Sequence, residues 1–267
     1  MKLSAPVYVL KSQAKELKKS QNISLSVALD EIAKKEGYAT WSLLISKHEN
    51  DVPDKFGDVL EFLNPADLVL VAARPGQGKT TFAAGLVSQA AKSGRPISYL
   101  FTVLERESES EQRIAVYLGS EQESNNICKV GSSDDISADH IVEAIGDKVA
   151  PGTLIVVDYL QLMDEKRINP PIQEQIERLK AFAKEHCCIF VFIGQIDPQV
   201  DGRDDRMPGL EDVRLPNPLD LNMFNKIIFM SRVRDATDRV QVKFAGKVNH
   251  TFDVGVDRKR KCIVDLA

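Results

Sequence analysis

Two kinds of hydrophobic pattern divide the chain. Over the first fifty residues, apolar positions recur at helical spacing, for example at Leu10, Ala14 and Leu17, which predicts amphipathic helices. From about residue 57, short continuous apolar runs alternate with amphipathic segments. Such runs are typical of parallel strands that are buried on both faces. The pattern therefore predicts a small helical N-terminal unit over residues 1–50 and a larger α/β domain over residues 57–267.

The small unit has recognisable helix boundaries. Its second helix is expected to begin after the cap residue Ser24 and to end at Gly37. Its first helix carries a single acid, Glu16, and several lysines: Lys11, Lys15, Lys18 and Lys19. A basic helix face of this kind either meets nucleic acid or an acidic partner, or is simply solvated. The polar stretch 48–56 is expected to be a linker.

The larger domain is predicted to alternate strands and helices. The expected strands cover 68–72, 97–104, 154–157, 189–193 and 226–230, and the expected helices cover 110–118, 138–149 and 172–185. This alternation implies a mostly parallel central sheet flanked by helices on both faces. Two alternating segments near the end, 239–244 and 252–256, predict a C-terminal β-hairpin. In sheets of this class, ligands bind at the carboxyl ends of the strands.

The first expected strand leads into a glycine-bearing turn, Ala73-Arg74-Pro75-Gly76-Gln77-Gly78-Lys79-Thr80-Thr81. A strand, such a turn and a new helix together wrap a chain of phosphates, because the turn's N–H groups and the helix N-terminus face the anion. The pattern assigns Lys79 to the β- and γ-phosphates and Thr80 to Mg²⁺. At Gly78 a Cβ would crowd the phosphate. The usual first glycine is replaced by Ala73, which lies outside the Gly-Lys-Thr end that makes most phosphate contacts.

Three strand ends carry further chemistry. Asp158 follows the apolar run 154–157 and is expected to hold Mg²⁺ beside the threonine of the turn. Glu105 follows the second expected strand, where a carboxylate can polarise the water that attacks the γ-phosphate. Glu107 and Glu109 lie close by, so spacing alone does not choose among the three. Gln195 ends the fourth strand, where a neutral amide suits a γ-phosphate sensor; an ordinary polar strand terminus is the alternative.

Composition narrows the class of protein. No apolar run approaches the length of a membrane span, and the N-terminus has no signal-peptide pattern. The four cysteines have no C-x-x-C spacing and are interpreted as reduced thiols, which favours a cytoplasmic protein, and four scattered histidines argue against a zinc site. A net charge of −4 argues against a wholly basic, nucleic-acid-coated surface but leaves room for a local basic channel.

The segments ARPGQGKTT, LIVVDYLQLM and FIGQ, in that order, resemble the RecA-type ATPase domain of DnaB-type replicative helicases. The most specific piece is the run 158–163, which is similar to that family's Walker B segment, and Arg74-Pro75 is a typical lead into its Walker A turn. The resemblance covers residues 57–245. It implies a homo-oligomeric ring, a hexamer in that family, with ATP and Mg²⁺ bound between subunits and single-stranded DNA in the channel. It also makes Glu105 the catalytic carboxylate.

The chain departs from this family in two places. The family's large N-terminal primase-binding domain is expected to be missing, with the short helical unit in its place. The family also reaches into the neighbouring active site with a lysine and an arginine, one residue apart on a late strand. The best match here keeps Lys243 but has Ala245 in place of the arginine. Because a trans arginine is worth about 10³ to 10⁵ in rate, slow hydrolysis is expected unless Lys247 or Arg239 substitutes.

Contact with DNA stays open from the sequence. The segment 197–221 takes the place of the family's DNA-facing loop and has three arginines, Arg203, Arg206 and Arg214. They are outnumbered by acids: Asp197, Asp201, Asp204, Asp205, Glu211 and Asp212. Because DNA affinity comes largely from cations, an acidic loop predicts weak binding, although backbone contacts leave no sequence trace. For the basic cluster 258–261, nucleic-acid contact and plain solvation are equally good interpretations.

Two functions fit these observations. The first is an ATP-hydrolysing, helicase-like translocase on single-stranded DNA, with Lys79, Glu105 and Gln195 as the catalytic residues. Its nucleotide-binding residues would be Arg74, Pro75, Gly76, Gln77, Gly78, Lys79, Thr80 and Thr81, with Thr80 and Asp158 on Mg²⁺. The second is a nucleotide-dependent switch or scaffold of the RecA class without unwinding activity. A phosphotransferase would need an acceptor site and a lid, for which the sequence offers no candidate.

Overall fold

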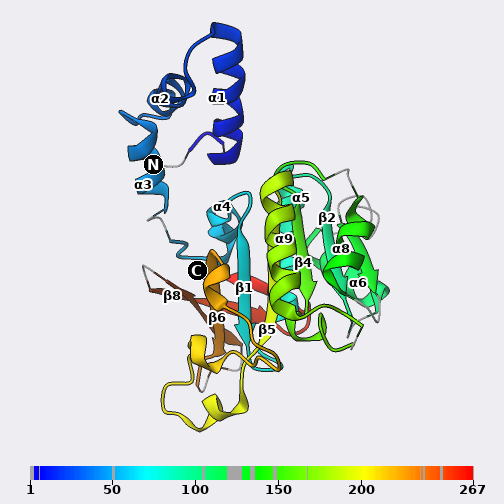
Figure 1. Cartoon of the computed structure of the whole chain (residues 1–267). Helices are drawn as coiled ribbons and strands as arrows, with labels where there is room; N and C mark the ends of the chain where they lie inside the picture. The colour runs from blue at the N-terminus through cyan, green and yellow to red at the C-terminus, as the bar shows by residue number, and fades with distance from the viewer. Residues whose placement is uncertain are drawn as a thin grey trace. The chain divides into compact units, whose positions relative to one another are not determined.

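The computed structural model describes residues 3–5, 7–49, 52–103, 106–118, 128–132, 136–146, 149–166, 168–234, 236, 238–246 and 249–266. The chain forms two compact units, Met1–Pro53 and Asp54–Ala267 (Figure 1). Each unit has its own hydrophobic core. Among the described residues, no helix has both the length and the apolar character needed to cross a membrane.

The first unit consists of three helices, α1 (Val7–Gln21), α2 (Leu25–Lys35) and α3 (Trp41–Glu49). The expected cap is confirmed, because the Ser24 hydroxyl accepts a hydrogen bond from the Val27 N–H at 3.3 Å. The core of this unit contains two of the residues expected at helical spacing in α1, Leu10 and Ala14, whereas Leu17 is only partly buried against it. The other core residues are Ala28, Ile32, Ala33 and Leu44.

The expected stop of α2 is also confirmed. Gly37 adopts a φ of 86°, in the left-handed region that favours glycine. The N–H of the next residue, Tyr38, bonds back to the carbonyl of Ala33 at 2.9 Å. The helix therefore ends on a glycine-containing cap, as the sequence predicts.

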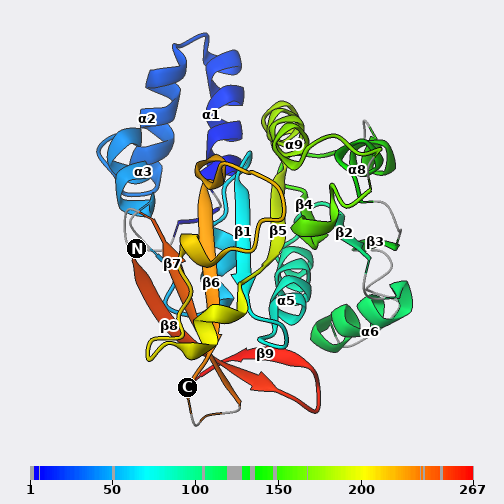
Figure 2. The same ribbon diagram turned by 60° about the horizontal axis from the view of Figure 1, so that its bottom comes forward.

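The second unit is built around one mixed sheet with the strand order β3-β2-β4-β5-β1-β6-β7-β8-β9 (Figure 2). The strands are β1 (Leu68–Ala73), β2 (Ser98–Thr102), β3 (Cys128–Ser132), β4 (Leu154–Asp158), β5 (Ile189–Gln195), β6 (Lys226–Arg232), β7 (Arg239–Ala245), β8 (His250–Asp257) and β9 (Cys262–Asp265). Pairing is parallel from β3 to β6 and antiparallel from β6 to β9. The fold is an α/β fold with a mostly parallel sheet at its centre, as predicted.

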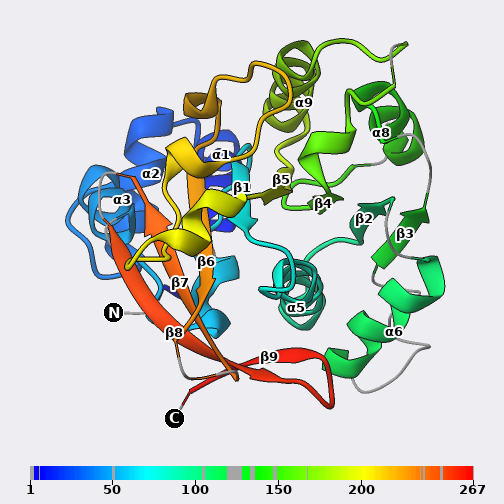
Figure 3. The same cartoon turned by 90° about the horizontal axis from the view of Figure 1, so that it is seen from below.

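Helices cover both faces of this sheet. They are α4 (Val59–Phe62), α5 (Lys79–Lys92), α6 (Glu107–Leu118), α8 (Ala138–Ile145) and α9 (Ile172–His186). Short 3₁₀ turns are η1 (Phe56–Asp58), η3 (Leu160–Leu162), η4 (Pro198–Gly202), η5 (Leu210–Asp212) and η6 (Leu221–Met223). Viewed along the strands, α5 and α6 lie on one face and α8 and α9 on the other (Figure 3). The fully buried strands β1 and β4 lie between these layers, which explains their continuous apolar runs.

The C-terminal strands extend the central sheet. β7 pairs with β6, for example Phe244 with Ile228, and β8 pairs with β7. β9 begins next to α6, where the Ile263 N–H donates to the Tyr117 hydroxyl at 2.7 Å, and then runs beside α5 (Figure 3). The predicted hairpin is thus present and becomes a three-strand edge of the sheet.

Several predicted boundaries were wrong. The second strand ends at Thr102 instead of residue 104, and Leu104 and Glu105 lie outside the described residues. The helix expected over 138–149 ends at Ile145, where Gly146 has a φ of 65°. The strand β3 was not predicted, because Lys129 and Gly131 interrupt its apolar pattern.

Candidate nucleotide-binding site

The turn between β1 and α5 opens at the carboxyl edge of the sheet. Gly76 and Gly78 have φ angles of 74° and 92°, which non-glycine residues rarely adopt. Apart from the chain neighbours, no atom of the described residues lies within 4 Å of a Cβ built on either glycine. A side chain at Gly78 would therefore crowd a bound phosphate but no described atom of the protein. The positive backbone angle is a separate reason for glycine at this position.

Lys79 is folded over this turn. Its Nζ donates to the carbonyl oxygens of Ala73 at 3.0 Å and Arg74 at 3.1 Å. Burial lowers the pKa of Lys79 to about 8, and the Asp158 carboxylate partly opposes that shift. The ammonium group is thus held at the turn by two backbone acceptors, in a position from which it can exchange them for phosphate oxygens.

Thr80 and Asp158 come together from opposite sides of the strand β5. The Thr80 hydroxyl donates to Oδ2 of Asp158 at 2.7 Å. Asp158 ends β4 and is largely buried, at 8% exposure. A hydroxyl and a carboxylate at this distance are hard oxygen donors of the kind that Mg²⁺ prefers. The described residues contain no cluster of three or more His, Cys, Asp or Glu side chains suited to a metal.

Gln195 ends β5 directly beside Ala73 of β1. Its backbone is held by the buried side chain of Gln161, whose Oε1 accepts from the Gln195 N–H at 3.2 Å. The amide group of Gln161 donates to the carbonyls of Gln195 at 3.4 Å and Arg214 at 2.8 Å. Gln161 thus joins the strand end of the expected sensor to Arg214, in the middle of the loop between β5 and β6. Its sequence signal is slight, a polar residue between Leu160 and Leu162.

Thr81, also assigned to nucleotide binding, faces away from the turn toward α6. Its hydroxyl accepts from Nη1 of Arg113 at 3.3 Å, and its carbonyl accepts from the Tyr117 hydroxyl at 3.0 Å. The residue is buried, at 9% exposure. Its contacts therefore fix the first turn of α5 against α6.

Two arginines brace the outside of the turn. Arg74 donates to the carbonyl of Ile196 at 3.2 Å and pairs with Asp201 at 3.0 Å. Arg232, at the end of β6, donates to the carbonyl of Gly76 at 2.9 Å. Pattern reasoning missed Arg232 because its position beside the turn results from the pairing of β6 with β1, far apart in the sequence.

Among the residues that the structure describes, no further candidate is found at this site. Glu105 and Lys247 lie outside the described residues. Lys243 is half-buried on β7, opposite Phe229 and Thr251, and Arg239 is exposed at the start of that strand. A role for these cations in a neighbouring subunit stays a prediction.

Comparisons with known proteins agree with the resemblance expected from the sequence motifs. The family described as DnaB-like helicase C terminal domain matches residues 144–262. The replicative DNA helicase DnaB of Mycoplasma genitalium is 26% identical over 204 residues, covering 64% of this chain and 43% of that protein. The corresponding protein of Pasteurella multocida is 30% identical over 200 residues, covering 61% and 42%. The chain thus spans less than half the length of these relatives.

Solved structures share the fold. A DnaB-like replicative helicase, determined for its interactions with primase, matches with a TM-score of 0.68 and 20% identity, covering 97% of this chain and 76% of that one. The solved ATPase domain of a second protein matches with a TM-score of 0.67 and 20% identity, covering 85% and 96%. At these identities the structural matches establish the RecA-like fold of the sheet domain.

Proposed function

We propose that this chain, a relative of the DnaB-type replicative helicases through its RecA-like ATPase domain, binds ATP with Mg²⁺, hydrolyses it and acts on single-stranded DNA. The observation that carries the proposal is the convergence of three side chains at one strand edge. Lys79 lies in the open glycine turn, and Thr80 contacts Asp158 at 2.7 Å. An ammonium group, an open glycine turn and paired oxygen donors suit a magnesium-bound triphosphate.

Each residue has a separate part in the proposed reaction. The N–H groups of the turn and Lys79 bind and orient the β- and γ-phosphates, which offsets charge that develops during transfer. Thr80 and Asp158 hold Mg²⁺, which neutralises phosphate charge when bound. Gln195 senses the γ-phosphate from the adjacent strand end. For Glu105 we propose the role of orienting the attacking water, on the strength of the family motif.

The working form is proposed to be a homo-oligomer, a hexameric ring, with ATP between subunits. The relationship to DnaB-type helicases supports this proposal, and so do the exposed Arg239 and the half-buried Lys243 on β7, which lies between β6 and β8. Single-stranded DNA is the proposed second ligand. Because the chain spans 42–43% of its curated relatives, the activity of a whole replicative helicase is also a proposal for this chain.

ATP turnover with and without single-stranded DNA tests the proposal, with the Lys79→Ala protein as control. We expect Mg²⁺-dependent turnover that DNA stimulates and that the control loses. Light scattering with nucleotide present should show a species several times the mass of the 29.7 kDa chain. No retention of nucleotide by the wild-type protein would refute the proposal.

A second function is favoured by one residue. Ala245 stands where related helicases carry the trans arginine, which predicts slow hydrolysis. A nucleotide-dependent switch or scaffold would bind ATP, turn it over slowly and show no response to DNA. The same turnover assay separates the two functions, since only the translocase is stimulated by DNA.

A further inference from the structure

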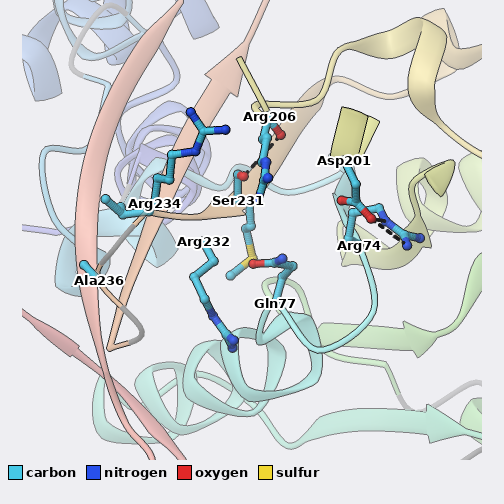
Figure 4. Close-up of a pocket in the computed structure, with 10 residues that line it drawn as sticks. Arg74, Gln77, Asp201, Arg206, Ser231, Arg232, Arg234 and Ala236 are labelled. Atoms are coloured by element: carbon cyan, nitrogen blue, oxygen red, sulfur yellow. Dashed lines mark hydrogen bonds and ion pairs between the residues drawn. The ribbon is translucent and has the colours of Figure 1, made fainter. Parts of the chain in front are cut away.

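Two cavities of the sheet domain are lined by cations. One lies against the glycine turn, with Arg74, Gln77, Arg206 and Arg234 in its lining, and belongs to the surroundings of the nucleotide site (Figure 4). The other has a volume of about 450 Å³ and lies between α6 and the turn that joins β8 to β9, which Figure 3 shows beside α6. We call it the basic pocket. Its lining comprises Glu109, Gln112, Arg113 and Val116 from α6 and residues 259–261 from the turn.

Both walls of the basic pocket are fixed by the fold. The four α6 residues follow each other at spacings of three, one and three, which places them on one face of the helix. The opposite wall is shaped by Asp257, whose Oδ1 accepts from the N–H groups of Lys259 at 2.9 Å and Arg260 at 3.0 Å. Lys261 closes the turn with a φ of 54°. The cavity therefore does not depend on a ligand for its shape.

The basic pocket carries an excess of positive charge. Among the described lining residues, four cations face a single acid, Glu109. That acid already accepts from the N–H of Arg106 at 3.4 Å. The Nζ groups of Lys259 and Lys261 have no hydrogen-bond or ion-pair partner among the described residues, and both lysines are exposed. The turn thus presents two uncompensated ammonium groups to the cavity.

The cationic surface is short, which limits the size of the ligand. On α6, Glu107 and Glu111 stand close to the lining residues, and Asp257 precedes the turn. A long polyanion that continued along either wall would meet these carboxylates. No described residue of the lining is aromatic, so a base has no platform on which to stack. Small-molecule sites have volumes of about 300–1,000 Å³, a range that includes this cavity. A compact anion therefore fits better than a nucleic-acid strand.

We infer that the basic pocket binds a small soluble anion with a chain of phosphate groups, which it recognises without contacting a base. A guanidinium group offers paired N–H donors to phosphate oxygens, and lysines add point charges. Four cations on two facing walls match several phosphate groups better than one. This site lies outside the glycine turn and is an addition to the proposed ATP site.

Arg113 connects the basic pocket with the helix that follows the glycine turn. Its Nη1 donates to the Thr81 hydroxyl at 3.3 Å, one residue after Thr80. An anion in the pocket competes with Thr81 for this guanidinium group. A hydrogen bond of this kind contributes a factor of about 2 to 10. We therefore expect the bound anion to lower kcat for ATP by about 2- to 10-fold, an effect that rests on the proposed function.

The test is calorimetric titration of the full chain with tripolyphosphate in the absence of Mg²⁺. We expect two sites per chain, one at the glycine turn and one at the basic pocket. Lys259→Ala/Lys261→Ala should weaken only the pocket site, by about 10- to 100-fold, because two charge-assisted contacts are lost. Lys79→Ala should remove only the other site. Lys261→Gly should also weaken the pocket site while keeping thermal stability, because glycine adopts the φ of this position without strain.

The matched control is Lys166→Ala/Lys184→Ala, which removes the same charge from exposed positions outside the pocket lining. It should change the affinity of either site less than about twofold, because salt screens distant charges. An equal loss in this control would overturn the inference, since only net charge would then matter. A single site that needs Lys79 and ignores both turn lysines would overturn it too. A single site that needs the turn lysines and ignores Lys79 would support the pocket and refute the proposed nucleotide site.

Two more measurements complete the test. If Lys259→Ala/Lys261→Ala weakens oligo-dT binding and leaves tripolyphosphate binding unchanged, the ligand is a nucleic acid and the inference is overturned. For the effect on turnover, ATP is varied at excess free Mg²⁺ with and without tripolyphosphate. Competition at the glycine turn raises the KM in every protein, whereas the fall in kcat should occur in the wild-type protein and be lost in the turn variant. An unchanged wild-type kcat would overturn the link through Arg113.

Discussion

Gln161 is expected to control turnover without touching the nucleotide. It lies on the segment after Asp158 and holds two backbone positions with one buried amide group. These are the N–H and carbonyl of Gln195, at 3.2 and 3.4 Å, and the carbonyl of Arg214, at 2.8 Å. Gln161→Leu keeps the approximate shape of the side chain and removes all three bonds. The strand end that carries Gln195 then loses its side-chain support and keeps only backbone bonds, such as that from the Arg214 N–H to the Gln195 carbonyl at 2.9 Å.

The expected loss of stability follows from the two shorter hydrogen bonds, to the Gln195 N–H and the Arg214 carbonyl. Removing the amide leaves each of these buried backbone groups unsatisfied, which costs about 1–3 kcal/mol per group. The free energy of unfolding should therefore fall by roughly 2–4 kcal/mol, allowing for partial relaxation and water. For turnover, a displacement of about 1 Å at a reacting group costs up to about 10²-fold. We expect Gln161→Leu to lower kcat by about 10- to 100-fold while the KM for ATP changes little.

The chain provides a matched control in Gln175. This buried amide also makes three backbone bonds, to the Ala138 N–H at 2.8 Å, the Met163 carbonyl at 2.9 Å and the Pro170 carbonyl at 2.7 Å. None of them involves β5 or the loop after it. Gln175→Leu should lose at least as much stability as Gln161→Leu and keep most of its kcat. Urea unfolding and steady-state ATP turnover, measured well below the unfolding transition, compare the two proteins.

The comparison can refute the reasoning in two ways. If both variants lose kcat in proportion to their loss of stability, Gln161 matters only for folding. If Gln161→Leu keeps full kcat and full stimulation by DNA, the position of Gln195 is not set by this amide or has no part in turnover. Either result would remove the argument for Gln161 as a positioning residue.

Three further residues carry predictions through their charge. Because burial lowers the pKa of Lys79 to about 8, ATP affinity should fall as the pH rises through about 8, and Lys79→Arg, if it binds ATP, should abolish that dependence. Because of the same lowered pKa, the unfolded chain binds more protons than the folded chain above about pH 8. In urea titrations of the nucleotide-free protein, the free energy of unfolding should therefore rise with pH in that range. Asp158→Asn should raise the Mg²⁺ needed for half-maximal turnover about 10- to 100-fold, in a Mg²⁺ titration. Burial opposes the shift, but the hydrogen bonds from Arg203 lower the pKa of Asp212. In urea unfolding, Asp212→Asn should therefore lower the free energy of unfolding by about 1–3 kcal/mol at neutral pH. The variant should also lose less stability than the wild-type protein as the pH falls.

The sequence predicted the elements whose signal is local. The run 68–72 and the turn ending at Lys79-Thr80 form one uninterrupted strand-turn-helix unit, because buried apolar residues and glycine angles are specified over a few positions. The cap at Ser24 and the stop at Gly37 are local in the same way. Strand β3 escaped prediction because Lys129 and Gly131 break its apolar run at the end of the sheet.

The contacts that the sequence did not predict depend on the order of the strands in the sheet. Arg232 reaches the Gly76 carbonyl because β6 pairs with β1, although the two residues are 156 positions apart in the chain. Gln161 holds Arg214 across 53 positions. No short-range pattern encodes such contacts, since they exist only after the sheet has assembled. The pairing of the C-terminal hairpin was not predicted either, because an alternating pattern in the sequence does not show that β7 pairs with β6.

The loop after β5 shows why residue counts mislead about electrostatics. Counted along the chain, acids outnumber arginines, which predicts weak DNA binding. In the fold, the charges are sorted by position: Asp212 is buried against Arg203, and Asp197 caps a turn. Arg206 faces a pocket together with Arg234, which the chain supplies from beyond β6. Local potential depends on which charges share a surface and which are already paired. For this reason the loop's net charge alone does not predict how strongly the loop attracts an anionic ligand.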